Sequence, residues 1–315
     1  MILALAGGVG GAKLANGLAQ LLNPSELVIA VNTGDDFRHL GLHISPDLDS
    51  VMYCLAGVNN KETGWGLAGE TWNFMEGLER LGGPIWFKLG DSDLATHVER
   101  SRLLAAGKTL SAVTATLCER FGVAHTIVPM SDNNVATIVR SKDRWHSFQE
   151  YFVALKCEPA VMEIKFDGIE FALPSPALLA TLESKELEGI VICPSNPFVS
   201  IDPILAIPGL RALIDRLEVP IVAVSPIIDG RAIKGPALKM MKEMSLEPNA
   251  IGVARYYWHL IDGFVLDEVD SHLAREFETF KIRTVFADTI MKDANDQKRV
   301  AAAALKLVAD LRASE

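Results

Sequence analysis

Two pairs of aspartates near the start of the chain are the residues whose type and spacing best suit metal chemistry. Asp35 and Asp36 follow a short apolar run, and Asp47 and Asp49 follow a Ser-Pro pair one loop later. A Ser-Pro pair is typical of a helix start, where the helix dipole alone can account for Asp47. Asp49 lies deeper in the turn, so the dipole does not account for it. Carboxylates brought together repel unless a cation lies between them, and Mg²⁺ takes one or two carboxylates together with phosphate oxygens. We therefore expect a metal site here, with solvated helix caps as the alternative.

A glycine-rich turn at residues 7–13 follows the first apolar run and could bind an anion. It is not a G-x-G-x-x-G fingerprint, because Lys13 holds the position of the third glycine. It is not a Walker A loop either, because Leu14 follows the lysine where Ser or Thr is required. The bare N–H groups of such a turn and the dipole of the next helix suit a phosphate. Taken alone, the pattern fits a phosphate site and a tight structural turn equally well.

Histidines and tryptophans give weaker signals. His39 and His43 flank a glycine and His97 falls in a helical pattern, so a structural role is the simpler interpretation for each. No Ser-His-Asp or Cys-His arrangement can be assembled from the spacing. The tryptophans in the first third of the chain favour core packing, with a flat ring partner as the alternative; they are Trp65, Trp72 and Trp86.

The elements that must position these residues follow the pattern of an α/β protein. Short apolar runs alternate with helical patterns, which predicts a mostly parallel, Rossmann-like sheet with helices on both faces. Strands are predicted at residues 2–5, 27–31, 85–89, 126–129, 189–193, 220–225, 263–266 and 283–287. Helices are predicted after the glycine turn, from Asp91 or Asp93 to Gly107, and over residues 293–311. Nearly every strand runs into a polar loop, and these loops share the sheet edge where open α/β sheets bind ligands.

Residues 135–185 break this pattern. Strand-like runs at 135–139, 146–154 and 161–171 are separated by charged or Pro/Gly turns, which predicts a small antiparallel insertion. We expect one domain over residues 1–315 that contains this insertion.

The composition limits the partners and the compartment. The chain has 315 residues and a formal net charge of −10, so a nucleic-acid partner is not expected, and a phosphorylated substrate would need a metal ion or local basic groups. The four cysteines form no C-x-x-C pair and no zinc spacing, which indicates buried thiols in a reducing compartment. The apolar N-terminus is too short for a signal peptide, and no stretch is long enough to span a membrane, so a cytoplasmic location is expected.

A group of motifs over nearly the whole chain carries a more specific signal. In the first half they are AGGVGGAKL at 6–14, NTGDD at 32–36, ISPDLDSVMYCLAG at 44–57, GWG at 64–66, ET at 70–71, KLGDSDLATH at 88–97 and PMSD at 129–132. In the second half they are PSNPFVSIDPIL at 194–205, VSPIID at 224–229 and KGPA at 234–237. Together they resemble the 2-phospho-L-lactate transferase family, which acts in biosynthesis of the deazaflavin coenzyme F-420.

The resemblance implies a transferase that forms a phosphodiester. In this family the ribityl hydroxyl of a deazaflavin, 7,8-didemethyl-8-hydroxy-5-deazariboflavin, attacks the distal phosphorus of a guanosine diphosphate ester of 2-phospholactate, and GMP leaves. Some bacterial members use the phosphoenolpyruvate equivalent. The resemblance also implies a Mg²⁺ cofactor, a Rossmann-like fold and a homodimer. Such a transfer requires positioning and charge neutralisation more than covalent chemistry from the protein.

The resemblance also implies site residues. It places the deazaflavin contacts on Asp49 and Lys88 and the metal near Asp36 and Asp49. One of these two aspartates is expected to help remove the hydroxyl proton, and the motifs do not separate a base from a metal ligand. The residues expected to hold guanosine and phosphates are Gly8, Gly10, Gly11, Lys13, Ser195, Asn196, Ser225, Lys234 and Gly235.

Three departures and two alternatives stay open. The chain has Ser92 where the family usually has arginine, Asn133 where a second aspartate is usual, and Asp229 in place of glycine. They leave open whether the transferred acid is phospholactate, phosphoenolpyruvate or phosphoglycerate. A nicotinamide-dependent dehydrogenase is disfavoured by the missing third glycine. A nucleotide-sugar-binding regulator without catalysis is the other alternative, since regulators of that type share the architecture.

Overall fold

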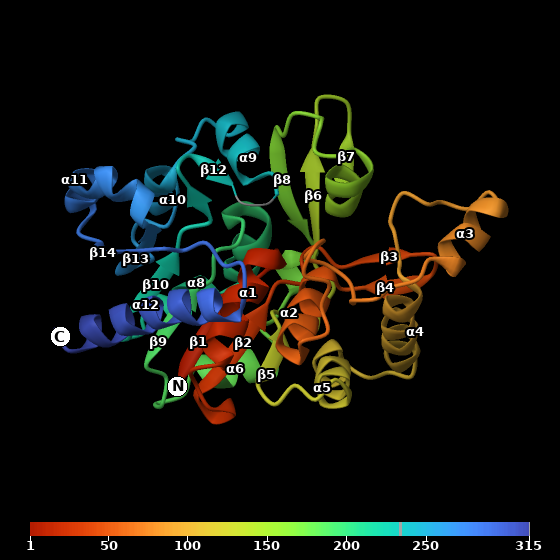
Figure 1. Ribbon diagram of the computed structural model, residues 1–315, viewed down its shortest axis with the longest axis horizontal. Helices are drawn as coiled ribbons and strands as arrows, with labels where there is room; N and C mark the ends of the chain where they lie inside the picture. The colour runs from red at the N-terminus through yellow and green to blue at the C-terminus, as the bar shows by residue number, and fades with distance from the viewer. Residues whose placement is uncertain (233–234, 315) are drawn as a thin grey trace.

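A seven-stranded parallel sheet forms the centre of the protein (Figure 1). The computed structural model describes residues 1–232 and 235–314. Across the sheet the strands run in the order β5-β2-β1-β9-β10-β13-β14. Their bounds are β1 (Ile2–Ala6), β2 (Leu27–Val31), β5 (Thr126–Pro129), β9 (Gly189–Ile192), β10 (Ile221–Val224), β13 (Gly263–Asp267) and β14 (Arg283–Ala287). The chain winds outward from β1 in both directions, so the strand order reverses between β1 and β9, as in a Rossmann fold. The predicted fold class is confirmed.

The four inner strands β2, β1, β9 and β10 are apolar throughout because helices cover both faces of the sheet. Along β1, Leu3 and Leu5 belong to one hydrophobic core, while Ile2, Ala4 and Ala6 belong to the other. This alternation follows from the two-residue period of a strand, which sends successive side chains to opposite faces. A run without polar residues is therefore what a sheet buried on both faces requires.

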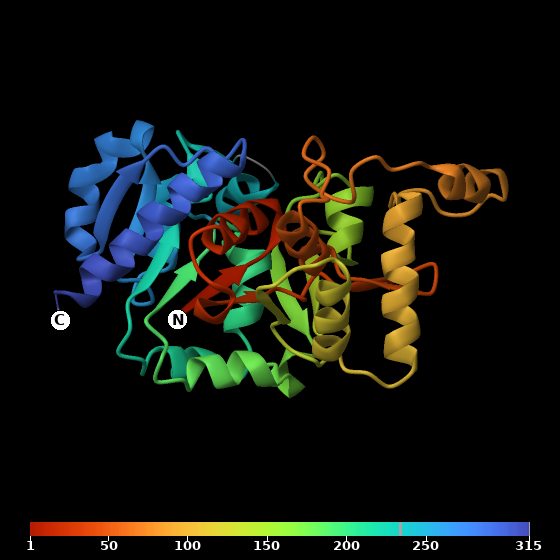
Figure 2. The same ribbon diagram turned by 60° about the horizontal axis from the view of Figure 1, so that its bottom comes forward.

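The helices divide between the two cores (Figure 2). The core behind the first face is built by α1 (Gly8–Ala19), α2 (Pro46–Ala56), α5 (Leu110–Arg120) and α12 (Ala294–Arg312). The opposite core is built by α6 (Pro176–Leu182), α7 (Asp202–Leu205), α8 (Leu210–Ile214), α9 (Ala237–Glu243), α10 (Ala250–Tyr256) and α11 (Ala274–Phe277). The remaining short elements are the helical turns η1 (Pro24–Glu26), η3 (Ile169–Phe171), η4 (Pro197–Ile201), η5 (Glu268–Leu273) and η6 (Glu278–Phe280), and the paired strands β11 (Ile227–Ile228) and β12 (Arg231–Ala232).

The antiparallel insertion is present, with different inner boundaries. Its three strands are β6 (Ala136–Arg140), β7 (Trp145–Ser147) and β8 (Glu163–Asp167), in the order β7-β6-β8. The predicted strand at 146–154 is wrong after Ser147, because Glu150–Ala154 form a π-helical turn. That turn buries Tyr151 in the same core as α6 and α10, so tertiary packing overrides the local strand preference there.

An arm projects beside the β5 side of the sheet (Figures 1 and 2). It consists of β3 (Phe37–His39), β4 (Leu42–Ile44), α3 (Asn73–Arg80) and α4 (Asp91–Ala105). The predicted strand at 85–89 is wrong, because Leu89 packs with Ile44 and Met75 in a small separate core instead of pairing with a strand. A short apolar run does not distinguish these two outcomes.

The start of α4 is capped differently from expectation. Gly90 is its N-cap, and neither Asp91 nor Asp93 takes that role. The carboxylate of Glu70 accepts hydrogen bonds from the backbone N–H groups of Ser92 and Asp93, both at 2.8 Å. A carboxylate from outside the helix therefore accepts hydrogen bonds from its first N–H groups and complements its dipole.

No described helix is both long enough and apolar enough to cross a lipid bilayer.

Candidate functional site

The glycine turn packs directly against the loop after β9, at the point where the strand order reverses. The Ser195 hydroxyl donates to the Gly7 carbonyl at 2.8 Å and accepts from the Gly7 N–H at 3.1 Å. A Cβ on Gly10 would lie 2.2 Å from the Pro194 carbonyl oxygen, and one on Gly11 would lie 2.7 Å from Ser195 Oγ. The structure thus brings Gly10, Gly11 and Ser195 together, and close packing alone requires these glycines.

This packing makes a prediction for Gly10. Replacing Gly10 with Ala should lower the free energy of unfolding by about 1–3 kcal/mol, because backbone must move to admit the methyl group. The matched control is Gly77→Ala in α3, where an added Cβ would meet only Arg80 Nη2, at 3.9 Å. The control should be neutral or more stable by about 0.5–1 kcal/mol. Thermal unfolding of both variants is the measurement, and equal midpoints would contradict the prediction.

Asp47 joins the glycine turn to the loop after β2. Its Oδ1 accepts the N–H of Gly8 at 2.6 Å, and its Oδ2 accepts Asn32 Nδ2 at 2.9 Å. Gly8 has φ +62°, a conformation that glycine adopts without strain. Asp47 is buried, and burial raises its pKa to about 6. The helix dipole alone therefore does not account for Asp47. Its two carboxylate oxygens connect the glycine turn to the loop after β2 through hydrogen bonds.

Asp35 and Asp36 add two further buried carboxylates beside Asp47. Burial raises the pKa of Asp35 well above its usual range, and the charges of Asp47 and Asp36 raise it further. Asp36 Oδ2 accepts the Ser45 hydroxyl at 2.7 Å and lies 3.0 Å from His43 Nε2. Asp36 Oδ1 is buried and has no hydrogen-bond partner within the part of the chain that the structure describes. The cluster therefore has an excess of negative charge and a free carboxylate oxygen.

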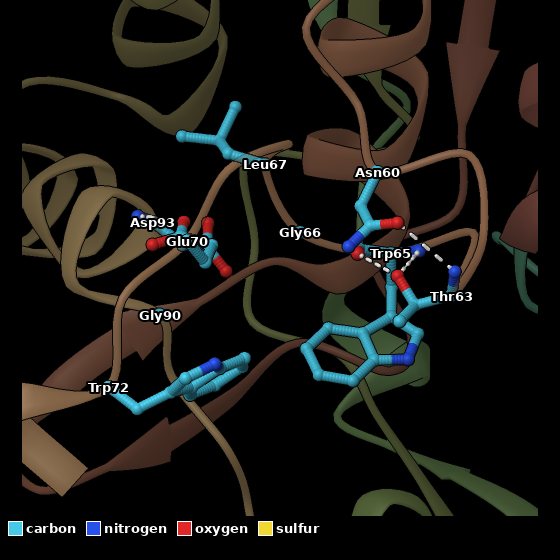
Figure 3. Close-up of a pocket in the computed structure, with 9 residues that line it drawn as sticks. All are labelled: Asn60, Thr63, Trp65, Gly66, Leu67, Glu70, Trp72, Gly90 and Asp93. Carbon is cyan, nitrogen blue, oxygen red and sulfur yellow. Dashed lines mark hydrogen bonds between the residues drawn. The ribbon is translucent and has the colours of Figure 1, made fainter.

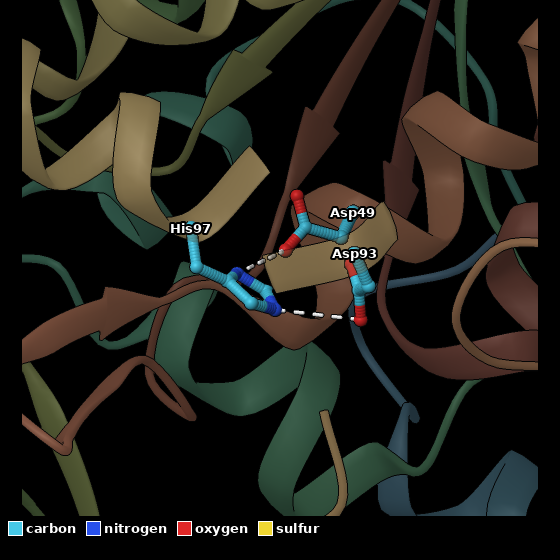
Figure 4. A group of neighbouring side chains, drawn as sticks. All are labelled: Asp49, Asp93 and His97. Atoms are coloured by element: carbon cyan, nitrogen blue, oxygen red, sulfur yellow. Dashed lines mark ion pairs between the residues drawn. The ribbon is translucent and has the colours of Figure 1, made fainter. Parts of the chain in front are cut away.

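Asp49 lies in a separate buried network between α2 and α4 (Figure 4). Its Oδ1 is hydrogen-bonded to the Arg100 guanidinium, and its Oδ2 lies 3.7 Å from His97 Nδ1. Asp93 Oδ2 lies 3.4 Å from His97 Nε2, and Asp93 Oδ1 accepts the Tyr53 hydroxyl at 2.7 Å. Asp49 Oδ2 is buried without a hydrogen-bond partner.

Arg100 and His97 oppose the effect of burial on the two aspartates of this network. Burial raises the pKa of Asp49, and the positive charge of Arg100 opposes that rise. Burial also acts to raise the pKa of Asp93, but hydrogen bonds and charge from His97 and a hydrogen bond from Tyr53 outweigh it and lower the pKa. Asp49, Asp93 and His97 offer ligand atoms within 4.8 Å of one another, which is close enough for a metal ion. Arg100 already supplies one positive charge there, so a cation is less needed here than at Asp36.

Sequence reasoning missed this network. Asp93, His97 and Arg100 are spaced i, i+4 and i+7 along α4 and so share one helix face. All three are buried, although two of these residue types are rarely buried unless paired. That polar stripe is the signal that could have identified them.

A cleft of about 550 Å³ opens at the edge of β2. We call it the β2–β6 cleft, because it lies between the loop after β2 and the insertion. Its lining residues are Thr33, Gly34, Asp35, Asp36, Phe37, Arg38, His43, Leu104, Lys108, Thr109, Leu110, Asp132, Asn133, Asn134, Val135, Ala136, Thr137, Ser147, Phe148 and Gln149. This volume is in the range of small-molecule sites. Asp36 is one of the lining residues, although its free oxygen is itself buried.

A second hollow lies on the arm (Figure 3). Trp65, Trp72, Glu70 and Asp93 are among the residues that line it. Its volume of about 20 Å³ is enough for a single water molecule and not for a ring. Lys88 is exposed nearby, with Nζ 6.0 Å from the centre of the Trp72 ring. No hydrogen bond or ion pair joins Lys88 to Asp49.

The remaining residues expected to hold the nucleotide lie at several places along the sheet edge. Lys13 Nζ donates to the Met291 carbonyl at 2.6 Å. The Asn196 side chain accepts the N–H of Phe198, and the Ser225 hydroxyl donates to the Ile227 carbonyl at 2.8 Å. Gly235 is exposed with φ +81°. Lys234 lies outside the described residues.

Comparison of this chain with known proteins identifies one family from its sequence and one similar fold from its structure. The family model described as 2-phospho-L-lactate transferase CofD matches residues 2–307. A phosphoenolpyruvate transferase of Streptomyces griseus is 41% identical over 99% of this chain and 99% of its own length. A 2-phospho-L-lactate transferase of Methanosarcina mazei is 38% identical over 94% of this chain and 96% of its own. A crystal structure of a UPF0052 family protein from Bacillus halodurans matches with a TM-score of 0.60 and 13% identity, covering 96% of this chain and 98% of that one. That likeness concerns the fold alone.

Proposed function

Because this chain belongs to the 2-phospho-L-lactate transferase CofD family, we propose that it transfers a phosphorylated three-carbon acid onto a deazaflavin in coenzyme F-420 biosynthesis. The donor is a guanosine diphosphate ester of 2-phospholactate or of its enolpyruvyl equivalent. The acceptor is the terminal ribityl hydroxyl of 7,8-didemethyl-8-hydroxy-5-deazariboflavin. The hydroxyl oxygen bonds to the distal phosphorus, the bond from that phosphorus to GMP breaks, and GMP leaves.

One observation carries the chemical part of this proposal. Two buried carboxylates, Asp36 and Asp49, each keep one oxygen without a hydrogen-bond partner among the described residues. Buried polar atoms are normally paired, so the free oxygen of Asp36 indicates a missing partner, and that of Asp49 offers a second carboxylate ligand. Arg100 pairs with Asp49 and donates to the His43 carbonyl at 3.5 Å. The ring of His43 in turn lies 3.0 Å from Asp36.

Mg²⁺ fits these donors. It prefers carboxylate and phosphate oxygens over nitrogen or sulfur, and both free atoms are carboxylate oxygens. We propose Asp36 and Asp49 as its ligands, with Asp36 the more accessible because it lines the cleft. When bound, the ion would neutralise charge that develops on the diphosphate. It would also allow a protein with a net charge of −10 to hold an anionic donor.

The switch point between β1 and β9 supports the placement of the nucleotide. Helix α1 begins at Gly8, beside Ser195, and a helix N-terminus at this position suits a pyrophosphate. We propose that Gly8, Gly10, Gly11, Ser195 and Asn196 hold the donor, together with Ser225, Lys234 and Gly235. Lys13 is proposed to join them, since its ammonium has donors besides the one that bonds the Met291 carbonyl.

The acceptor hydroxyl must lose a proton as its oxygen attacks. We propose that Asp36 accepts that proton, because it lines the cleft, and that Asp49 helps to hold the acceptor. Lys88 is proposed to contact the deazaflavin from the arm, where the Trp72 ring lies beside it. The cytoplasmic location, the single domain, the homodimer and the absence of a nucleic-acid partner stay predictions.

Turnover with defined substrates tests the proposal. The chain is incubated with the deazaflavin, Mg²⁺ and, in turn, the guanosine diphosphate esters of lactate, enolpyruvate and glycerate, and products are identified by mass. GMP and the deazaflavin phosphodiester should form together in equal amounts with at least one ester. Tight binding of a UDP-sugar without GMP release from any ester would instead support the nucleotide-sugar-binding regulator.

A further inference from the structure

The β2–β6 cleft carries buried hydroxyls that nothing in the described protein satisfies. Thr33 Oγ1 and Thr137 Oγ1 are both buried, both lack a hydrogen-bond partner, and both residues line the cleft. Each residue is only 2% exposed, so bulk water is not an obvious partner. A threonine hydroxyl can rotate to donate, and unpaired buried hydroxyls are uncommon in folded proteins. Both buried donors belong to residues that line one cleft, and a ligand packed against the cleft wall would supply the acceptors that they lack.

The same cleft carries two cations without partners. Arg38 and Lys108 line it, and neither has an ion pair or a side-chain hydrogen bond within residues 1–232 and 235–314. The nearby carboxylates contact other groups. Asp35 accepts a hydrogen bond from Gln149, and Asp132 accepts one from the Ser111 N–H. Asp36 contacts Ser45 and His43. In a chain with a net charge of −10, two cations left unpaired on a ligand-sized cleft favour an anion.

The charges of the cleft differ between its parts. Asp36 supplies a carboxylate that is proposed to hold Mg²⁺, while Arg38 and Lys108 supply positive charge on exposed side chains. A ligand that suits both parts has a phosphate for the metal and a second anionic group for the two cations. A phosphorylated carboxylic acid has these two groups, whereas a neutral ring or a sugar does not.

We propose that the β2–β6 cleft is the subsite for the acid of the donor. Arg38 and Lys108 bind its carboxylate, and the Thr33 and Thr137 hydroxyls donate to its oxygens. This inference rests on the proposed function and adds to it the residues that select the transferred acid. The cleft is larger than a three-carbon acid requires, so it also leaves room for the acceptor chain to approach the phosphorus.

Binding of free acids tests the carboxylate contacts without any need for turnover. Calorimetric titration of the protein with Mg²⁺ compares 2-phospholactate and phosphoenolpyruvate with isopropyl phosphate, in which a methyl group replaces the carboxylate of 2-phospholactate. The wild type should bind the two acids at least about 10-fold more tightly than isopropyl phosphate. The double variant Arg38→Gln/Lys108→Gln should lose that preference.

A matched control separates this effect from a general loss of charge. Arg80→Gln/Lys142→Gln removes two exposed cations that do not line the cleft, and it should keep the preference for the carboxylate. Equal binding of 2-phospholactate and isopropyl phosphate by the wild type would overturn the inference. A preference that persists in Arg38→Gln/Lys108→Gln would also overturn it.

Thr137 gives a second, independent test. Thr137→Val removes the hydroxyl with almost no change of shape, so the thermal midpoint without ligand should be unchanged or higher. The rise in that midpoint caused by 2-phospholactate should shrink, and Thr137→Ser should restore it. A purely structural role would instead lower the midpoint without ligand, and that result would remove Thr137 from the subsite.

The two proposals can fail separately. A wild type that binds 2-phospholactate with the expected preference but releases no GMP from any ester would contradict the proposed function and leave the subsite standing. If the wild type turns over normally, and both double variants prefer 2-phospholactate over isopropyl phosphate to the same extent, the subsite is contradicted and the function stands.

Discussion

Replacing Asp36 with Asn should reduce the rate of GMP release by roughly 10²–10⁴-fold, the range expected when a proton acceptor that also stabilises charge is lost. Asparagine keeps the size of the side chain and an oxygen for the Ser45 hydroxyl, which lies 2.7 Å away. It removes the negative charge and the proton-accepting ability. The initial rate of GMP release as a function of Mg²⁺ concentration is the measurement.

The stability of the same variant identifies the cause of the loss. The charge of Asp36 raises the pKa of both Asp35 and Asp47, so removing it relieves repulsion between buried carboxylates. The unfolding temperature should therefore stay close to that of the wild type. Asp132→Asn is the control, because Asp132 lines the same cleft and accepts the Ser111 N–H. Full activity of Asp36→Asn would remove Asp36 from the mechanism.

Replacing Arg100 with Met should lower the free energy of unfolding by about 3–5 kcal/mol, because it leaves a buried charge without its partner. The Arg100 side chain is 2% exposed and that of Asp49 is 7% exposed, and the two form an ion pair. Without Arg100, Asp49 must be buried as an isolated carboxylate or take up a proton. Urea unfolding followed by circular dichroism and by fluorescence gives the free energy where the two transitions coincide.

A double variant separates the ion pair from simple packing. Asp49→Leu/Arg100→Met removes both charges, so it should recover most of the lost stability, as replaced buried ion pairs often do. Arg102→Met is the exposed control, since its side chain is 60% exposed and pairs with Glu99. It should change the free energy by no more than about 0.5 kcal/mol. If Arg100→Met is as stable as Arg102→Met, the network does not stabilise the arm.

The sheet and its family could be predicted because the information is local and repeated. The inner strands of the sheet are short runs of apolar residues, and burial on both faces requires such runs. The motifs that resemble the family span the chain, and the family match over residues 2–307 confirms that resemblance. The predicted strand at 85–89 is wrong because an apolar run indicates that a segment is buried but not what it packs against. Here it packs against the β3–β4 hairpin.

The candidate site was only partly predictable. Asp36 and Asp49 were selected from the sequence as a possible metal pair, and each does keep a free oxygen. That Asp49 already has Arg100 as a partner, from a helix 51 residues further on, depends on how α2 and α4 pack. The role of Asp47 in fastening Gly8 to Asn32 likewise depends on contacts between loops that follow different strands.

The fold class, the family and the sheet edge where polar loops gather follow from the sequence alone, because periodicity and contiguous motifs are properties of neighbouring residues. Which polar atoms of the described residues stay without a partner depends instead on the packing of the folded chain. Nothing in the sequence distinguishes the side chains of Thr33, Asp36 and Thr137 from others of their type. Each has a buried oxygen without a hydrogen-bond partner among the described residues because of the residues that pack around it. Whether a buried group is satisfied is a property of its whole surroundings, which chain segments far apart in sequence create together.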